Sequence, residues 1–121
     1  MMEHTRRPKP LCFWQQNVNK SLISQLDLLN QVDPKLFNFD FIQEPHIDFL
    51  NLTRANSHWS VIYPTCHHSS QNTTRSVTLV STSVSKNKWK QIHVQSEDVT
   101  AVELCGDFGT VSFYKDRKSV V

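Results

Sequence analysis

The chain lacks any hydrophobic run long enough to act as a signal peptide or to cross a bilayer. Apolar residues make up 38% of its 121 residues, and they are spread in short clusters, whereas a membrane helix needs about 20 in succession. Positive and negative charges nearly cancel, leaving a formal charge of +2, without the concentrated basic face typical of nucleic-acid binders. The three cysteines are widely spaced and form no C-x-x-C pair. These absences predict an intracellular protein with reduced, buried thiols and no membrane association.

The chain does contain enough residues for one ordinary domain, and too few for two. Residues 1–10 form a polar arm with two prolines and a basic run at residues 6–9. A solvated tail is the favoured interpretation of that run, and a nuclear address or a phosphate-contacting arm is the alternative. We therefore predict one domain over residues 11–114, between this arm and a C-terminal tail of residues 115–121.

The hydrophobic pattern of the first half predicts a strand, a helix and a second strand. Apolar clusters favour strands over residues 11–16 and 39–43. Between them, leucines recur at positions i, i+4 and i+7 within residues 21–30, the spacing of an amphipathic helix. Ser21 or Asn19 is the expected cap of this helix.

The second half predicts short strands joined by polar turns. A helical turn is expected over residues 47–50, before this change of character. β-branched and aromatic residues then mark strands at residues 58–63, 76–81, 89–94, 99–104 and 110–114. Consecutive short strands with hairpin-like links predict an antiparallel or mixed sheet. The expected fold class is α/β, with a mixed sheet and one main helix.

Polar side chains follow directly after the first two predicted strands. Asn17 and Asn19 come after the first strand, and Glu44 comes after the second. The intervening segment is long enough for a parallel crossover, so both strands should end at one sheet edge, where open α/β sheets bind ligands. A carboxylate with neutral amide oxygens suits Mg²⁺, which completes its coordination with water and substrate phosphate. The alternative is structural, with asparagines that cap the helix and a Glu44 carboxylate in solvent.

Three histidines provide weaker candidates. His46 lies two residues from Glu44 and could reach the same cleft. His67 and His68 adjoin Cys66, but they lack the usual spacing of metal ligands. We expect these two histidines to be solvated residues of a polar loop.

Two arginines and five aromatic residues at strand positions each allow a functional and a structural interpretation. Arg54 and Arg75 are expected near the cleft edge, where phosphate contact and simple solvation fit the sequence equally well. Aromatic residues at strand positions are expected in the core, and stacking platforms for unpaired bases are the alternative. The aromatic residues concerned are Trp14, Phe41, Trp59, Trp89 and Phe113.

Two motifs, in this order, resemble the opening of the endonuclease/exonuclease/phosphatase superfamily. They are Trp14-Gln15-Gln16-Asn17-Val18-Asn19 and Phe39-Asp40-Phe41-Ile42-Gln43-Glu44-Pro45. Members of that superfamily commonly begin with a strand ending in Asn-x-Asn or Asn-x-Asp, then a helix, then a strand ending in Gln-Glu. The chain is most similar to the endonuclease domain of LINE-type retrotransposons. The similarity continues through Tyr63-Pro64, Arg75-Ser76-Val77 and Asp98-Val99-Thr100-Ala101-Val102.

This resemblance implies the N-terminal half of a four-layer α/β sandwich (DNase I-like) and a metal-dependent phosphodiesterase that nicks DNA. By the same resemblance, Glu44 corresponds to the metal-binding glutamate of the family. Asn17 corresponds to the asparagine that orients phosphate or metal, and Asn19 to the next active-site position. The implied cofactor is Mg²⁺ or Mn²⁺, and the implied partner is DNA.

The sequence departs from the family in several places. It contains neither the family's Asp-x-Asn motif nor its closing Ser-Asp-His motif, and residues 115–121 do not resemble the family's continuation. Residue 20 is lysine where many relatives carry glycine. These departures predict a truncated copy that is inactive alone, because it lacks the general-base half of the site. The alternatives are a non-catalytic module that binds nucleic acid or protein, and a fragment without function in isolation.

Overall fold

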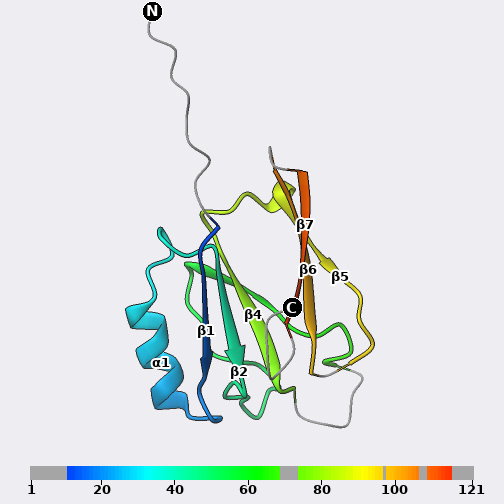
Figure 1. Cartoon of the computed structure of the whole chain (residues 1–121). Helices are drawn as coiled ribbons and strands as arrows, with labels where there is room; N and C mark the ends of the chain where they lie inside the picture. The colour runs from blue at the N-terminus through cyan, green and yellow to red at the C-terminus, as the bar shows by residue number, and fades with distance from the viewer. Residues whose placement is uncertain (1–10, 69–73, 97, 107–108, 116–121) are drawn as a thin grey trace, which may run out of the picture.

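The protein folds into two β-sheets and one α-helix within the residues that the structure describes (Figure 1). This structure is a computed structural model, and it describes residues 11–68, 74–96, 98–106 and 109–115. The predicted arm and the tail beyond residue 115 lie outside these ranges. The elements are β1 (Phe13–Asn17), α1 (Leu22–Gln31), β2 (Phe39–Gln43), β3 (Trp59–Ile62), β4 (Ser76–Ser81), the 3-10 turn η1 (Lys86–Lys88), β5 (Trp89–Ile92), β6 (Thr100–Gly106) and β7 (Gly109–Lys115).

The first sheet is mixed and has the strand order β1-β2-β4-β3. β1 and β2 are parallel, with Phe13 beside Phe39 and Asn17 beside Gln43, whereas β4 is antiparallel to both of its neighbours. The predicted strand–helix–strand unit is therefore confirmed. Ser21, rather than Asn19, is the helix cap, because its hydroxyl accepts a hydrogen bond from the amide of Ser24 at 3.2 Å.

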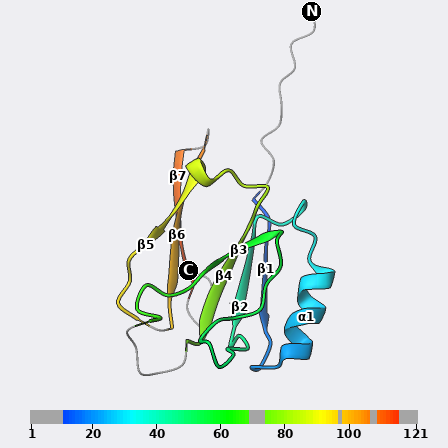
Figure 2. The same cartoon turned by 180° about the vertical axis from the view of Figure 1, so that it is seen from behind.

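The second sheet is antiparallel and has the order β5-β6-β7. The strands predicted in the second half of the chain are thus divided between the two sheets. Figures 1 and 2 show that α1 lies on one side of the first sheet and that the second sheet lies on the other side. The result is a strand-rich mixed α/β fold with one helix in the described part of the chain.

Two hydrophobic clusters fill the two sides of the first sheet. The helix-side cluster is formed by Val18, Leu28, Leu29, Val32, Ile42, Trp59, Val77 and Leu79. The inter-sheet cluster is formed by Phe39, Phe41, Ile62, Val80, Val102 and Leu104, with Phe113 packed against it. Alternate residues of β2 point to opposite sides, as the pleat of a strand requires, and all five of them are buried.

Asp40 is the only ionisable residue of β2, whose other residues are apolar or neutral. It lies between Phe39 and Phe41, on the side of β2 that α1 covers, and its side chain has no exposed surface. Neither carboxylate oxygen has a hydrogen-bond partner within the described residues. Burial therefore raises the pKa of Asp40 to about 8, since the charged form loses its hydration.

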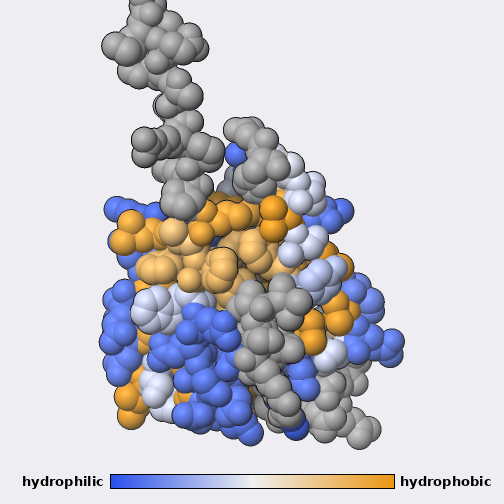
Figure 3. Space-filling model, in the orientation of Figure 1, coloured by the Kyte–Doolittle hydropathy of each residue, from blue (hydrophilic) through white to orange (hydrophobic). Residues whose placement is uncertain are grey.

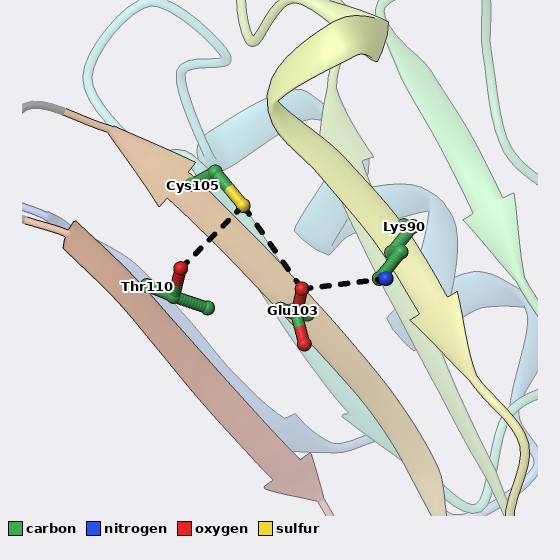
Figure 4. Close-up of polar contacts among 4 residues, drawn as sticks. All are labelled: Lys90, Glu103, Cys105 and Thr110. Atoms are coloured by element: carbon green, nitrogen blue, oxygen red, sulfur yellow. Dashed lines mark hydrogen bonds and ion pairs between the residues drawn. The ribbon is translucent and has the colours of Figure 1, made fainter.

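The outer face of the second sheet carries a row of polar contacts across its strands (Figure 4). Lys90 pairs with Glu103 at 3.5 Å, and the Cys105 sulfur lies 4.0 Å from Glu103 and 3.8 Å from Thr110. Cys105 is exposed, so the prediction of a buried thiol is wrong at this position. The thiol follows the alternation of β6, which turns Cys105 outward and buries Leu104.

The predicted helical turn over residues 47–50 is also wrong. Ile47 and Thr53 form a β-bridge instead, and the Asp48 carboxylate accepts hydrogen bonds from the amides of Leu50 and Leu52. This side chain satisfies the turn's amides and thereby competes with a helix.

In the described ranges, no helix has the length and apolar character needed to cross a membrane.

Candidate functional site

The ends of β1 and β2 meet at one edge of the first sheet, at the lower end in Figure 1. Their hydrogen bonding continues beyond the strands: the Val18 amide donates to Gln43 at 3.1 Å, and the Lys20 amide donates to the Glu44 carbonyl at 2.8 Å. The backbone that carries Asn17 and Asn19 therefore lies directly beside the backbone that carries Glu44. The sequence predicted this juxtaposition.

The loop after β1 is fixed by local hydrogen bonds. The Asn17 side-chain oxygen accepts from the Asn19 amide at 2.8 Å, which closes an Asx turn. Asn19 and Lys20 both have left-handed backbones, with φ of 53° and 62°. Asparagine tolerates this conformation, whereas lysine is less favourable there. The left-handed conformation gives a physical reason why glycine would be favoured at position 20.

Replacing Lys20 with glycine is expected to stabilise the fold by about 1 kcal/mol, because the left-handed conformation costs glycine nothing. Lys35→Gly is the matched control, since Lys35 is exposed and is not among the residues with positive φ. We expect the control to lower stability slightly through the greater entropy of the unfolded chain. Urea denaturation of both variants measures the difference in stability. Equal losses of stability in the two variants would contradict the assignment of an unfavourable left-handed backbone to Lys20.

Glu44 is anchored on both sides by its own backbone. Its amide donates to the Arg75 carbonyl at 2.8 Å, at the start of β4, while its carbonyl accepts from Lys20. Its φ of 50° takes it out of the strand conformation, so its side chain no longer follows the alternation of β2. The carboxylate is half-buried, and within the described residues no hydrogen bond or ion pair engages it.

Further polar side chains gather at the same edge. Gln43 lies between Asn17 on β1 and Ser76 on β4. The Arg75 guanidinium lies 3.8 Å from the Asp98 carboxylate, just before β6. The sequence drew attention to Gln43 and Arg75 but not to Ser76 and Asp98 as site residues. These two join the site through contacts between sheet strands far apart in sequence.

His46 is tied to the same loops by structural contacts. Its amide donates to the Gln25 side chain at 2.8 Å, and its ring nitrogen Nδ1 lies 3.3 Å from the Lys20 carbonyl. Gln25 is fully buried in α1 and also donates to Thr53 and to the Arg54 carbonyl. These contacts explain His46 as part of the support beneath the site.

His67 is buried, which corrects the prediction of a solvated loop histidine. Its Nε2 lies 2.6 Å from the Asn51 carbonyl, and its Nδ1 contacts the Thr74 hydroxyl. The ring stacks on Tyr63 with centroids 4.2 Å apart. Burial lowers the pKa of His67, the neighbouring His68 lowers it further, and the hydrogen bond to Asn51 partly offsets these effects. His68 is exposed, as predicted.

The residues that the structure describes contain no group of three or more His, Cys, Asp or Glu side chains able to hold a metal ion. Comparison with protein-family models, with curated proteins and with solved structures found no match in any of the three.

Proposed function

We propose that this chain is the metal-binding half of a magnesium-dependent phosphodiesterase of the endonuclease/exonuclease/phosphatase superfamily, of the LINE retrotransposon type. The observation that carries the proposal is the anchoring of Glu44 beside the Asn17–Asn19 turn. It joins the two sequence motifs on which the resemblance rests. The proposed fold of the complete domain is the four-layer sandwich, in which this chain supplies one helix layer and parts of both sheets.

The donor set at this edge fits Mg²⁺ or Mn²⁺. Mg²⁺ commonly takes one or two protein carboxylates and keeps several waters, and the half-buried Glu44 carboxylate is not engaged by another described side chain. The Asn17 side-chain oxygen accepts one hydrogen bond within the Asx turn, which leaves its second lone pair and its amide NH₂ group for other partners. We assign Glu44 as the metal ligand, and Asn17 and Asn19 as residues that orient metal-bound water or phosphate.

When bound, the metal would polarise a phosphoryl oxygen and stabilise the leaving oxyanion. The protein's own contribution is to hold the carboxylate and amides in place through backbone hydrogen bonds. The sequence contains neither Asp-x-Asn nor Ser-Asp-His, the motifs that would supply a general base. We therefore expect the chain by itself to bind metal and DNA without cleaving DNA.

Glu44→Gln is expected to weaken Mn²⁺ binding at least tenfold, because an amide replaces the only carboxylate assigned to the ion. Paramagnetic broadening of backbone amide signals by Mn²⁺ measures this. In the native chain, we expect the broadening to centre on Asn17, Asn19 and Glu44. Mg²⁺ in excess should reverse it.

Glu103→Gln is the matched control, because Glu103 is a carboxylate on the outer face of the second sheet, paired with Lys90. This variant should keep the native broadening pattern. Broadening that persists around Asn17 in Glu44→Gln would refute the metal assignment. Robust Glu44-dependent DNA cleavage by the native chain would refute its expected inactivity.

A non-catalytic binding module is the second candidate, and an exposed hydrophobic surface favours it. Figure 3 shows hydrophobic residues gathered over the upper part of the face where β1 and β7 lie in Figure 1. Phe13 on β1 is 43% exposed although its ring packs against Phe41 and Phe113. β1 and β7 are also edge strands of their sheets, and edges of this kind pair with other chains. A binding module would keep its partner when Glu44 is replaced by glutamine.

A further inference from the structure

The space between the two sheets changes from aromatic to polar along the strands. At one end Phe39, Phe41 and Phe113 pack together, with ring centroids 5.3 to 6.5 Å apart. At the other end Thr78 and Thr100 join the sheets through their hydroxyl groups, 2.5 Å apart. The polar end is the lower end in Figures 1 and 2, where β1 and β2 finish and β4 and β6 begin.

Three buried atoms at this polar end have no hydrogen-bond partner among the described residues: the Gln43 Nε2, the Ser76 hydroxyl and the Asp98 Oδ1. Gln43 and Ser76 are cross-strand neighbours, and their exposed fractions are 8% and 0%. An amide NH₂ group only donates, and a buried donor without an acceptor is costly. The Gln43 amide therefore needs an acceptor, and the Ser76 hydroxyl can donate to the same group, whereas the Asp98 Oδ1 faces Arg75.

Arg75 places a positive charge next to these donors. It directly precedes Ser76, and its carbonyl accepts the hydrogen bond from the Glu44 amide. Its guanidinium lies 3.8 Å from Asp98, beyond the range of a good hydrogen bond. The side chain is 43% exposed, and partly exposed ion pairs of this kind are weak. Arg75 is therefore able to turn toward a stronger acceptor.

We propose that Arg75, Gln43 and Ser76 bind one phosphate group of a nucleic-acid strand beside Glu44. A planar guanidinium presents paired donors that match phosphate oxygens, and the amide and hydroxyl groups add neutral donors. Asp98 is a positioning residue, which holds the guanidinium at the site when no phosphate is bound. The identification of the ligand as nucleic acid rests on the proposed function, whereas its class as an oxyanion rests on the donor set.

The test is the binding of a fluorescent single-stranded oligodeoxynucleotide to the full chain, in EDTA and over a range of salt concentrations. Arg75→Gln should weaken binding about tenfold, because a charged hydrogen-bonding contact is lost. It should also reduce the slope of log K against log salt by about 0.7, the share of one phosphate on a single strand. Arg75→Lys keeps the charge but not the paired donors, so its affinity for the oligonucleotide should fall between that of the native chain and that of Arg75→Gln.

Arg54→Gln is the matched control, since it removes the same charge from an exposed residue. We expect it to change affinity by less than about twofold. Asp98→Asn should tighten binding about twofold to threefold, because it releases the guanidinium from its present partner. In NMR spectra, the Arg75 Nε–H and Gln43 side-chain signals should shift when oligonucleotide is added.

Equal losses in Arg75→Gln and Arg54→Gln, an unchanged salt slope, or unshifted Arg75 and Gln43 signals would each overturn this inference. So would the absence of oligonucleotide binding by the native chain. These outcomes are independent of the Mn²⁺ experiment. A chain that binds Mn²⁺ at Glu44 but not oligonucleotide through Arg75 refutes the phosphate site alone. The reverse result refutes the metal assignment alone.

Discussion

Relative to the native chain, Asp40→Asn should gain several kcal/mol in free energy of unfolding between pH 4.5 and pH 7.5, since the cost of burying its amide does not change with pH. The native state holds this carboxyl between the first sheet and α1 without a hydrogen-bond partner in the described residues, and burial raises its pKa from 3.8 to about 8. At pH 7 the unfolded chain ionises the group freely, whereas the native state keeps it largely protonated. Each unit of pKa difference corresponds to about 1.4 kcal/mol.

The sign of the pH dependence follows from proton binding. Between pH 4 and pH 8 the native state binds more protons at Asp40 than the unfolded state does, so unfolding releases a proton. Rising pH therefore favours unfolding, by up to about 1.4 kcal/mol per pH unit. The contribution of Asp40 is fully retained below the unfolded pKa of 3.8 and is lost as pH rises through the native pKa of about 8.

Urea denaturation followed by tryptophan fluorescence at pH 4.5, 6 and 7.5 measures this effect. The free energy of unfolding of Asp40→Asn, relative to that of the native chain, should increase from pH 4.5 to pH 6 and again from pH 6 to pH 7.5. Asp27→Asn is the control, because Asp27 is exposed on α1, and its effect should stay near zero throughout. A difference between Asp40→Asn and the native chain that does not change with pH would rule out a buried, largely protonated Asp40.

Local pattern was enough to predict where α1 and several strands of the fold lie. The leucine spacing located α1, and the apolar clusters located β2 and β4 at the residues observed, 39–43 and 76–81. The helix was predicted because its leucines recur at helical spacing, and β2 and β4 because a short apolar run is typical of a strand that is buried on both faces. The distribution of strands between two sheets did not follow from pattern, because it depends on which strands pair, and those pairings join residues far apart in sequence.

Local sequence pattern could not predict the burial of Asp40 either. Alternation in Phe39-Asp40-Phe41 indicates a strand with one face in solvent, yet α1 covers that face. The sequence shows the helix and the strand but not the size of the surface that the helix covers. A polar residue in such a strand is therefore informative only when the packing of its neighbours is known.

Part of the candidate site could likewise be predicted from the sequence, and part could not. Two parallel strands with a helical crossover were enough to bring Asn17 and Glu44 to one edge, because topology alone fixes that relation. Ser76 and Asp98 join them only through the pairing of β2 with β4 and the packing of β6 on the first sheet. A serine at a strand start and an aspartate in a turn carry no signal of this in the sequence.

His67 illustrates how a loop of polar composition can contain a buried residue, and its replacement with alanine should lower stability by about 2–4 kcal/mol. The ring joins three segments, through Asn51, Tyr63 and Thr74. Its removal leaves the Asn51 carbonyl and the Thr74 hydroxyl without this partner, and it opens a cavity. His93→Ala is the control, because His93 is exposed, and it should change stability by less than about 0.5 kcal/mol.

Acidification distinguishes the histidine's charge from its packing. Since the native pKa of His67 lies below its usual 6.5, the native state binds fewer protons than the unfolded state, and stability falls as pH drops through 6.5. His67→Gln cannot titrate, so the stability that the native chain loses relative to this variant between pH 7.5 and pH 5 should isolate the histidine. Urea denaturation at these two pH values provides the measurement. Equal acid losses in both chains would show that the ring does not need to stay neutral, and that its contacts alone stabilise the loop.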